Sequence, residues 1–349
     1  MAEIASSYKV TYPREKLEAY LRNELIMPAT LELDITTNCT KKCELCPSTR
    51  SPRSSTLDLG FIENLFAALK GETKGLLLSG GEPTLAPTFP EVLRLGQTHG
   101  FSEIAIVTNG NLLDEEKVSD ALCRYASAVR VSIYNWTTQN RGEIVSTFER
   151  IKRLRSRIDR EGSGLQIGVS ALTSKENADA IPSIIREVAS TGAHWIYFHP
   201  LCSRWETGAP ERVDQSGVLE KIEQYKRDNS DFPVFTYADR YVKRSIGFSS
   251  YHGAHVLLVI GADGKNYLGA EVKYHPQYVV ADLNNWDDDF LWRQERLRRI
   301  HSVSSRTYSG MGSRHRGVMY SHIIQNLIDQ NERSLQKSST ERYVFPHIL

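Results

Sequence analysis

The chain of 349 residues lacks the features that mark several classes of protein. Its longest apolar run, at residues 255–260, is far shorter than the roughly 20 residues that cross a bilayer. Residues 1–16 contain five charged side chains and no apolar segment, so no secretory signal is expected there. A net charge of +1 gives no reason to expect nucleic acid or an anionic membrane as a partner. We therefore expect a cytoplasmic enzyme or binding protein.

Cysteine is also scarce, and its distribution is uneven. Only five cysteines occur, which is too few and too clustered for a disulfide framework. Three of them lie within eight residues, at Cys39, Cys43 and Cys46. Three thiolates on one loop can hold three corners of a cubane iron–sulfur cluster and leave the fourth iron open. The alternative is a zinc site that a distant histidine completes.

Between residues 30 and 200, short apolar runs alternate with longer amphipathic segments. The expected strands are 31–35, 75–79, 104–108, 129–133, 165–171 and 194–198. The expected helices are 58–70, 88–98, 114–125, 140–158 and 176–190. This rhythm predicts an α/β fold, a partial (βα)6 TIM-type barrel whose site lies at the C-terminal ends of the strands. The cysteine loop, a Gly-Gly-Glu-Pro run at 80–83 and a Thr-Asn-Gly run at 108–110 follow the first three strands in turn.

The pattern changes after residue 200. A helix is expected near 216–228, a β-hairpin over 255–268, and further helices near 286–300 and 318–330. We therefore divide the chain into a lead-in at 1–29, the barrel at 30–200 and a smaller α+β extension at 201–349.

The run Ser79-Gly80-Gly81-Glu82-Pro83 changes the interpretation of the cysteines. Glycines allow the backbone to approach a ligand closely, and Glu82 offers an acceptor for an ammonium group. In motif and order, these residues and the cysteine loop resemble the radical S-adenosylmethionine (SAM) superfamily. That resemblance covers about residues 30–200. It implies one [4Fe–4S] cluster, SAM bound at the open iron, and a 5′-deoxyadenosyl radical that takes a hydrogen atom from substrate.

The resemblance also assigns roles to individual residues. Cys39, Cys43 and Cys46 match the cluster ligands, and Gly80, Gly81 and Glu82 match the motif that receives the SAM amino group. The remaining positions that match SAM contacts are Leu45, Asn109, Ser132, Gly168 and Leu201. For Asn109 and Ser132, ordinary turn and strand polarity is the alternative.

The hairpin region resembles the opening of a twitch or SPASM extension, whose cysteines hold auxiliary clusters. Here no cysteine occurs after Cys202, so the resemblance implies a degenerate extension and a protein with a single cluster. Without an auxiliary electron acceptor, redox-neutral outcomes such as decarboxylation or another elimination are favoured. Cys202 follows the last barrel strand and is a candidate hydrogen donor, with a small buried hydrophobic side chain as the alternative.

Charged and aromatic residues in the extension are candidates for substrate contacts, although any one of them could equally belong to a solvated loop. They are Arg204, Glu271, Lys273, Tyr274, His275, Arg314 and Arg316.

These observations, together with the resemblance to single-cluster enzymes of nucleoside and aminoglycoside pathways, lead to a functional expectation. We expect a radical SAM enzyme that acts on the sugar part of a small metabolite in natural-product biosynthesis, by decarboxylation of a sugar or nucleoside uronic acid. The expected partners are this substrate and an external one-electron reductant of flavodoxin or ferredoxin type. The alternatives are an epimerase or dehydrogenase of an aminocyclitol or sugar, and a peptide-modifying enzyme, although only about 30 residues precede the first strand.

Overall fold

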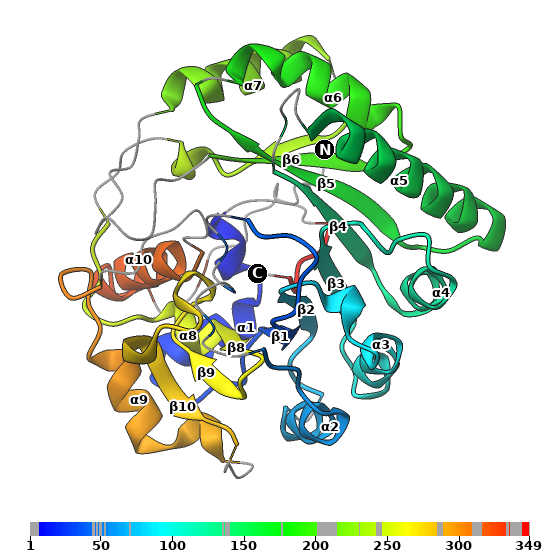
Figure 1. Ribbon diagram of the computed structural model, residues 1–349. Helices are drawn as coiled ribbons and strands as arrows, with labels where there is room; N and C mark the ends of the chain where they lie inside the picture. Colours follow the sequence, from blue (N-terminus) through cyan, green and yellow to red (C-terminus); the bar gives the residue numbers. More distant parts are fainter. Residues whose placement is uncertain are drawn as a thin grey trace.

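The computed structural model describes residues 7–43, 46, 48, 51, 54–69, 71–134, 136, 140–175, 177–200, 215–229, 231–241, 246–284, 289–308, 316–332, 335 and 344–348. Its centre is one curved sheet of ten strands in the order β10-β9-β8-β1-β2-β3-β4-β5-β6-β7. Figure 1 shows this sheet curling as a partial barrel, with helices outside it. The α/β fold and the partial TIM-type barrel predicted from the sequence are confirmed.

Seven consecutive strands run parallel in this barrel. They are β1 (Thr30–Thr36), β2 (Gly75–Gly80), β3 (Glu103–Thr108), β4 (Ala128–Ile133), β5 (Gln166–Thr173), β6 (Trp195–Pro200) and β7 (Val234–Thr236). Each of the six expected strands is present to within two residues at either end, whereas β7 was not predicted. Apolar positions on alternate residues pack against the outer helices, and the other positions face the inside of the barrel.

The helices between the strands cover the outside of the sheet (Figure 1). They are α2 (Leu59–Ala68), α3 (Phe89–Thr98), α4 (Glu116–Tyr125), α5 (Arg141–Glu161), α6 (Ile181–Ala189) and α7 (Ser216–Asp228). Asp58 caps α2, because its side chain accepts a hydrogen bond from the Phe61 amide. Single-turn 3₁₀ segments occur at Pro83–Leu85 and Ala178–Ala180.

The C-terminal part continues the barrel sheet. Strand β8 (Leu257–Ile260) pairs in parallel with β1, and β9 (Lys265–Tyr267) and β10 (Val279–Asp282) follow in antiparallel order. The expected hairpin therefore extends the sheet itself. The predicted domain boundaries at 29/30 and 200/201, and the twitch- or SPASM-like character of this part, stay predictions.

Further helical segments pack around this edge of the sheet. They are a 3₁₀ turn at Ser7–Thr11, α1 (Arg14–Leu21), α8 (Gly253–Val256), α9 (Gln294–His301) and α10 (Arg316–Asp329), with 3₁₀ turns at Ala238–Arg240, Ala270–Val272, Pro276–Tyr278 and Phe290–Trp292. The helix expected near 286–300 begins only at Gln294. Both α1 and the 3₁₀ turn before it contribute to a second apolar cluster with α10.

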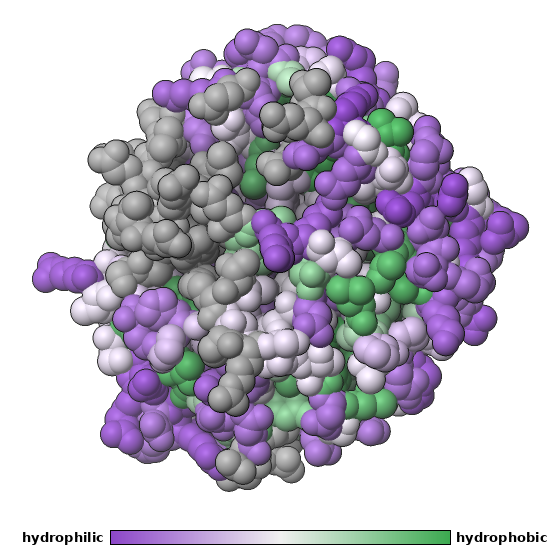
Figure 2. Space-filling view, in the orientation of Figure 1, coloured by the Kyte–Doolittle hydropathy of each residue, from purple (hydrophilic) through white to green (hydrophobic). Residues whose placement is uncertain are grey.

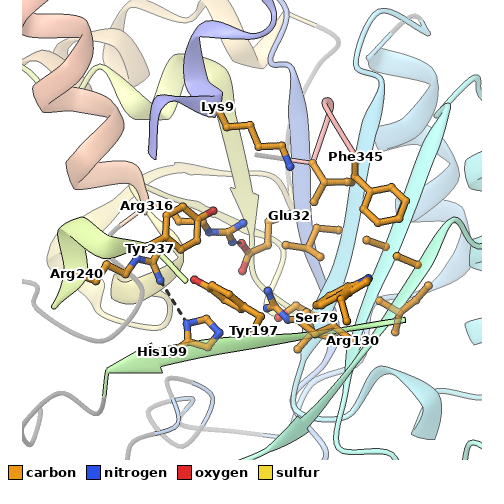
Figure 3. Close-up of a pocket in the computed structure, with 17 residues that line it drawn as sticks. Lys9, Glu32, Ser79, Arg130, Tyr197, His199, Tyr237, Arg240, Arg316 and Phe345 are labelled. Carbon is orange, nitrogen blue, oxygen red and sulfur yellow. Dashed lines mark hydrogen bonds and ion pairs between the residues drawn. The ribbon is translucent and has the colours of Figure 1, made fainter. Parts of the chain in front are cut away.

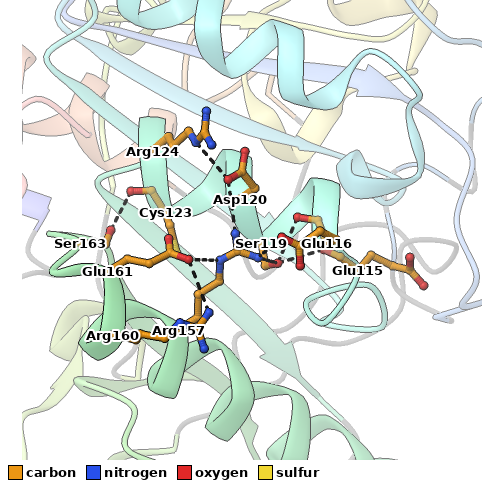
Figure 4. Close-up of polar contacts among 10 residues, drawn as sticks. All are labelled: Glu115, Glu116, Ser119, Asp120, Cys123, Arg124, Arg157, Arg160, Glu161 and Ser163. Carbon is orange, nitrogen blue, oxygen red and sulfur yellow. Dashed lines mark hydrogen bonds and ion pairs between the residues drawn. The ribbon is translucent and has the colours of Figure 1, made fainter.

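Polar contacts join the outer helices α4 and α5. Figure 4 shows Arg157 on α5 at the centre of this network, facing three carboxylates. Its guanidinium lies 3.0 Å from Glu116, 3.3 Å from Asp120 and 2.8 Å from Glu161. Because one planar guanidinium serves two helices, this contact fixes their relative position.

The surface over α5 and α6 is largely hydrophilic in the view of Figure 2. None of the helices that the structure describes has the length and apolar character needed to cross a bilayer.

Candidate functional site

The cysteine loop begins where β1 ends. The loop is held from the end of β3, where Asn109 Nδ2 lies 3.7 Å from Cys39 Sγ and donates to Thr40 Oγ1 at 3.1 Å. The amide of Lys41 also donates to Cys39 Sγ, at 3.4 Å. Amide hydrogen bonds to a cysteine sulfur stabilise its thiolate form, which is the form that binds iron.

The two glycines after β2 pack against the backbone of this loop. Gly80 has φ of +124°, and a Cβ there would lie 2.4 Å from Thr36 O. At Gly81 a Cβ would lie 2.2 Å from Asn38 O. The loop and the glycine turn are joined by hydrogen bonds from Gly81 N to Thr36 O and from Glu82 N to Asn38 O, at 2.8 and 2.7 Å. Any side chain at either glycine would therefore displace the start of the cysteine loop.

Glu82 is buried and joins the ends of β2 and β3. Its Oε1 accepts from Thr84 N at 3.1 Å and from Thr108 Oγ1 at 2.7 Å. Its Oε2 accepts from Asn109 N at 2.7 Å. A carboxylate oxygen has more than one lone-pair site, so Oε2 keeps capacity for a further donor beside Asn109. Glu82 thus positions Asn109, which in turn holds the cysteine loop.

These residues fit an iron–sulfur cluster. Cys39 and Cys43 are both exposed, so their sulfurs are accessible on the loop surface. Cys46 lies close to Cys43, because its amide donates to the Cys43 carbonyl at 3.2 Å. Although both residues are exposed overall, partial desolvation of their sulfurs raises the pKa of the Cys39 and Cys43 thiols, and neighbouring cysteines raise both further. Iron binding would therefore release protons from this loop.

Two other predicted SAM contacts lie on inward-facing strand positions. Ser132 on β4 donates to the Tyr134 hydroxyl at 3.2 Å. Gly168 on β5 lies against the indole of Trp195, and a Cβ at this position would be 2.1 Å from that ring. The absence of a side chain at Gly168 thus makes room for Trp195. Roles of these two residues toward SAM stay predictions.

Within the barrel, polar and aromatic side chains surround a cavity of about 80 Å³, which we call the lumen (Figure 3). Its charged and aromatic lining residues are Lys9, Glu32, Arg130, Trp195, Tyr197, His199, Tyr237, Arg240, Arg316 and Phe345. Small and aliphatic side chains complete the lining: Leu77, Ser79, Ala105, Ile106, Val107, Ala128 and Ile348.

Two arginines of the lumen are oriented by aromatic rings. The Arg240 guanidinium lies 4.0 Å from the centre of the Tyr237 ring, and that of Arg130 lies 5.7 Å from the centre of Tyr197. Arg240 Nη1 also donates to His199 Nδ1 at 3.5 Å. Stacking on an aromatic face keeps a guanidinium in a defined plane.

The carboxylate of Glu32 is already engaged by cations. Lys273 Nζ lies 3.0 Å from Glu32 Oε1 and 2.7 Å from Asp34 Oδ1, and Arg316 forms an ion pair with Glu32 Oε2. The Tyr274 hydroxyl donates to Asp34 Oδ2 at 2.8 Å. Lys273 and Tyr274 were both predicted to contact substrate, and here they bind the carboxylates of β1. Arg316 does line the lumen.

Glu271 and His275, two further predicted residues of the extension, are not among the residues that line the lumen. Glu271 is fully buried and accepts hydrogen bonds from the hydroxyls of Tyr251 and Tyr308, at 2.7 Å each. Burial raises the pKa of the Glu271 carboxyl. The His275 ring lies 5.3 Å from that of Tyr278. Five predicted residues lie outside the described part of the chain: Leu45, Leu201, Cys202, Arg204 and Arg314.

Four lumen residues were not predicted from the sequence: Arg130, Arg240, Tyr197 and Lys9. A signal for Arg130 and Tyr197 was present. Buried parallel strands are usually continuously apolar, yet β4 and β6 alternate apolar and polar residues, which indicates a polar inner face. No comparable signal exists for Arg240 or Lys9, because both lie in 3₁₀ turns.

Comparison with known proteins gives the following matches. Residues 33–163 match the radical SAM superfamily. A tungsten-containing aldehyde ferredoxin oxidoreductase cofactor-modifying protein from Pyrococcus furiosus is 30% identical over 175 residues, which is 46% of this chain and 48% of that protein. The GTP 3′,8-cyclase of Chlorobaculum tepidum is 33% identical over 89 residues, or 25% of this chain and 27% of the cyclase. The chain thus spans about half or less of the length of these curated relatives.

Solved structures show the same fold. Streptococcus suis SuiB bound to S-adenosylmethionine matches with a TM-score of 0.63 and 15% identity, over 98% of this chain and 81% of that chain. SuiB bound to its precursor peptide SuiA matches with a TM-score of 0.65 and 14% identity, over 95% and 80%. At such identity the likeness concerns the fold alone.

Proposed function

The chain carries a radical SAM domain at residues 33–163, and we propose that it uses this domain to act on the sugar part of an acidic small metabolite. Members of the superfamily bind a [4Fe–4S] cluster and SAM, which together supply a 5′-deoxyadenosyl radical. Cys39, Cys43 and Cys46 would hold the cluster. The Gly80–Glu82 turn would form the wall beside the SAM amino group.

The charge of the lumen carries the proposal. Among the described residues that line it, four are basic (Lys9, Arg130, Arg240 and Arg316), and the carboxylate is Glu32. Arg316 and Lys273 both pair with Glu32, and basic side chains outnumber carboxylates among the described residues that line the lumen. An anionic group would compensate this excess, and the planar guanidinium edges of Arg130 and Arg240 suit a carboxylate.

The aromatic walls support a ring-shaped, hydroxyl-bearing substrate. Trp195 and Tyr197 are buried side by side on the inner face of β6. Neither Trp195 Nε1 nor the Tyr197 hydroxyl has a hydrogen-bond partner among the described residues. Buried polar atoms normally have partners, so both atoms are available to substrate hydroxyls. The name of the matching GTP 3′,8-cyclase states that it acts on a nucleotide, which agrees with a nucleoside acid as substrate.

Loss of carbon dioxide is the reaction we favour. Hydrogen abstraction from the sugar would leave a carbon radical. The bond to the carboxylate carbon would then break with release of CO₂, a proton would bind the electron pair left on the sugar, and the abstracted hydrogen atom would return from 5′-deoxyadenosine, so that the net change is R–COO⁻ + H⁺ → R–H + CO₂. The sequence has no cysteine after Cys202 that could hold an auxiliary electron acceptor. A step without net oxidation of the substrate therefore suits this chain, with an external flavodoxin- or ferredoxin-type protein as reductant.

The main alternative, an epimerase or dehydrogenase of an aminocyclitol, is disfavoured by charge. An aminocyclitol is a cation at neutral pH and would face Arg130, Arg240 and Lys9 across a buried cavity. The charge argument does not apply to an epimerase or dehydrogenase that acts on a neutral sugar. The role of Cys202 as hydrogen donor stays a prediction, and so does peptide modification.

The test compares an acid with its neutral counterpart. The anaerobically reconstituted full chain receives a nucleoside whose hexose is a uronic acid, or the analogue with a hydroxymethyl group in place of the carboxylate. We expect turnover and CO₂ release with the acid only. Equal turnover of the neutral analogue would overturn the proposed substrate class. Solvent deuterium at a single inverted carbon, without CO₂, would instead favour epimerisation.

The variant Arg240→Met separates substrate charge from cofactor chemistry. Removing a hydrogen-bonded cation from the lumen should raise KM for the acid by about 10- to 100-fold, corresponding to the 1.5–3 kcal/mol of a charge-assisted bond. Arg160→Met is the matched control, because Arg160 is an exposed side chain on α5. An unchanged KM in Arg240→Met would contradict the proposed contact.

A further inference from the structure

The N-terminal ends of three neighbouring barrel strands bind one segment from near the end of the chain. The segment 344–348 lies where β1, β2 and β3 begin (Figure 1). The Thr30 hydroxyl donates to the His347 carbonyl. The amides of His347 and Ile348 donate to Glu103 Oε2 at 2.8 and 3.1 Å. Thr30 and Glu103 are the first residues of β1 and β3. The segment therefore covers the end of the barrel at which the strands begin, which we call the lower mouth.

The first residue of β2 makes room for this segment. A Cβ at Gly75 would lie 1.9 Å from the His347 carbonyl oxygen and 2.7 Å from its carbon. Since that neighbour is backbone, it cannot move aside by a rotamer change. Glycine at position 75 is therefore a requirement of the seated segment.

Phe345 projects from this segment into the barrel. Its ring packs against Leu77, Ala105 and Ala128, which are inward-facing residues of β2, β3 and β4. Phe345 also lines the lumen that contains Arg130 (Figure 3). Two alanines at this level leave the space that a phenyl ring fills. Arg130 follows Ala128 on the same face of β4, so it lies directly above this level.

We propose that Phe345 forms the floor of the substrate pocket and determines how far an acidic substrate enters the barrel. This inference rests on the proposed function, in which the lumen binds the substrate acid. Substrates of TIM-type barrels enter from the C-terminal ends of the strands. The phenyl ring stops the acid at the level of Arg130, where the guanidinium meets it. A longer acid would extend into the space of the ring, and Phe345 excludes it.

The first experiment tests the floor without any substrate. Trp195 lines the lumen and is 4% exposed, so its fluorescence reports access from the lower mouth. Phe345→Ala should raise the quenching of the Trp195 component by iodide, whereas Phe345→Leu should retain protection. Comparison with the same variants carrying Trp195→Phe isolates this component. Unchanged quenching in Phe345→Ala would overturn the floor, whatever the substrate is.

Gly75→Ala provides an independent way to open the lower mouth of the barrel. It displaces the segment from outside the lumen and replaces none of the side chains that line the lumen. We expect quenching of Trp195 to rise as in Phe345→Ala. If Gly75→Ala does not fold, the result with Phe345→Ala still decides the question.

The second experiment tests selectivity with defined probes. The nucleoside uronic acid and its homologue with one additional methylene before the carboxylate are compared in the native chain and in Phe345→Ala. The variant should shift the ratio of kcat/KM toward the homologue by about tenfold or more, because one methylene in a closed pocket changes selectivity by 10- to 200-fold. The amount of 5′-deoxyadenosine per product should also rise with the shorter acid, because it is held less firmly.

The outcomes of the two experiments separate the two proposals. If the native chain turns over neither acid but quenching changes as expected, the proposed substrate is refuted. The position of Phe345 as the floor of the pocket is then retained. Turnover of the uronic acid with an unchanged selectivity ratio in Phe345→Ala would refute the role of Phe345 and keep the proposed function.

Discussion

The two ends of the barrel strands differ in how they are built. At the C-terminal end, Cys39, Glu82 and Asn109 belong to short motifs that directly follow three successive strands. Within the lumen, Arg130, Arg240 and other residues come from separate strands and turns across the chain. In the proposed function, the motif end generates the reactive species and the lumen selects the molecule that this species meets. The lumen carries no contiguous motif.

The two regions also differ in how their charges are arranged. The cysteine loop exposes two thiols and is held by hydrogen bonds from Asn109 and Lys41. Glu32 and Asp34 are instead fully buried, and the cation between them is Lys273. Changes at the motif end should therefore affect chemistry more than folding, whereas changes below it should affect folding or substrate affinity.

Replacement of a cluster cysteine should have the largest effect. Cys43→Ser removes one of three thiolates, so we expect reconstituted protein with little iron and SAM cleavage reduced to background. Formation of 5′-deoxyadenosine and bound iron are measured together. Cys123→Ser is the matched control, since Cys123 lies on helix α4. Full SAM cleavage by Cys43→Ser would refute the assignment of this loop.

Replacement of the buried Lys273 should have the second largest effect, which is on the stability of the fold. Lys273→Met leaves two buried carboxylates without the cation that lies between them, which destabilises folded proteins by about 3–5 kcal/mol. The midpoint of denaturant unfolding measures this loss, and Lys226→Met, at a partly exposed ion pair on α7, is the control. If both variants unfold at the same denaturant concentration, the network does not stabilise the fold.

The contrast between the regions explains what the sequence could predict. Six barrel strands and the cap at Asp58 follow from periodicity and local hydrogen-bond chemistry, which depend on neighbouring residues. The path of the cysteine loop against Gly80 and Gly81 could only be inferred in part, because it depends on contact between strands. Glu32 and Asp34 alternate with apolar residues in β1, and this alternation predicts that they share one face of the strand. Their partner Lys273 is about 240 residues away, so the sequence does not predict the ion pair. The pairing of β8 with β1 and the seating of residues 344–348 are likewise contacts of long range, for which a single sequence carries no signal.

The smallest expected effect lies at the lower mouth of the barrel and appears as a pH dependence. Burial raises the pKa of Glu103 from 4.5 to about 7, while hydrogen bonds from His347 and Ile348 and the charge of Lys9 act against this shift. Between about pH 4.5 and pH 7 the folded chain therefore holds a proton that the unfolded chain has lost, so the contribution of Glu103 to stability falls as pH rises through this window and is constant above it. The pKa of His347 is lowered by burial, which gives an opposite slope below about pH 6.5. Glu103→Gln removes only the first contribution, so the difference in unfolding free energy between the native chain and this variant should decline from pH 4.5 to 7. Parallel stability curves for the two proteins would show that Glu103 does not hold its proton at the seat of residues 344–348.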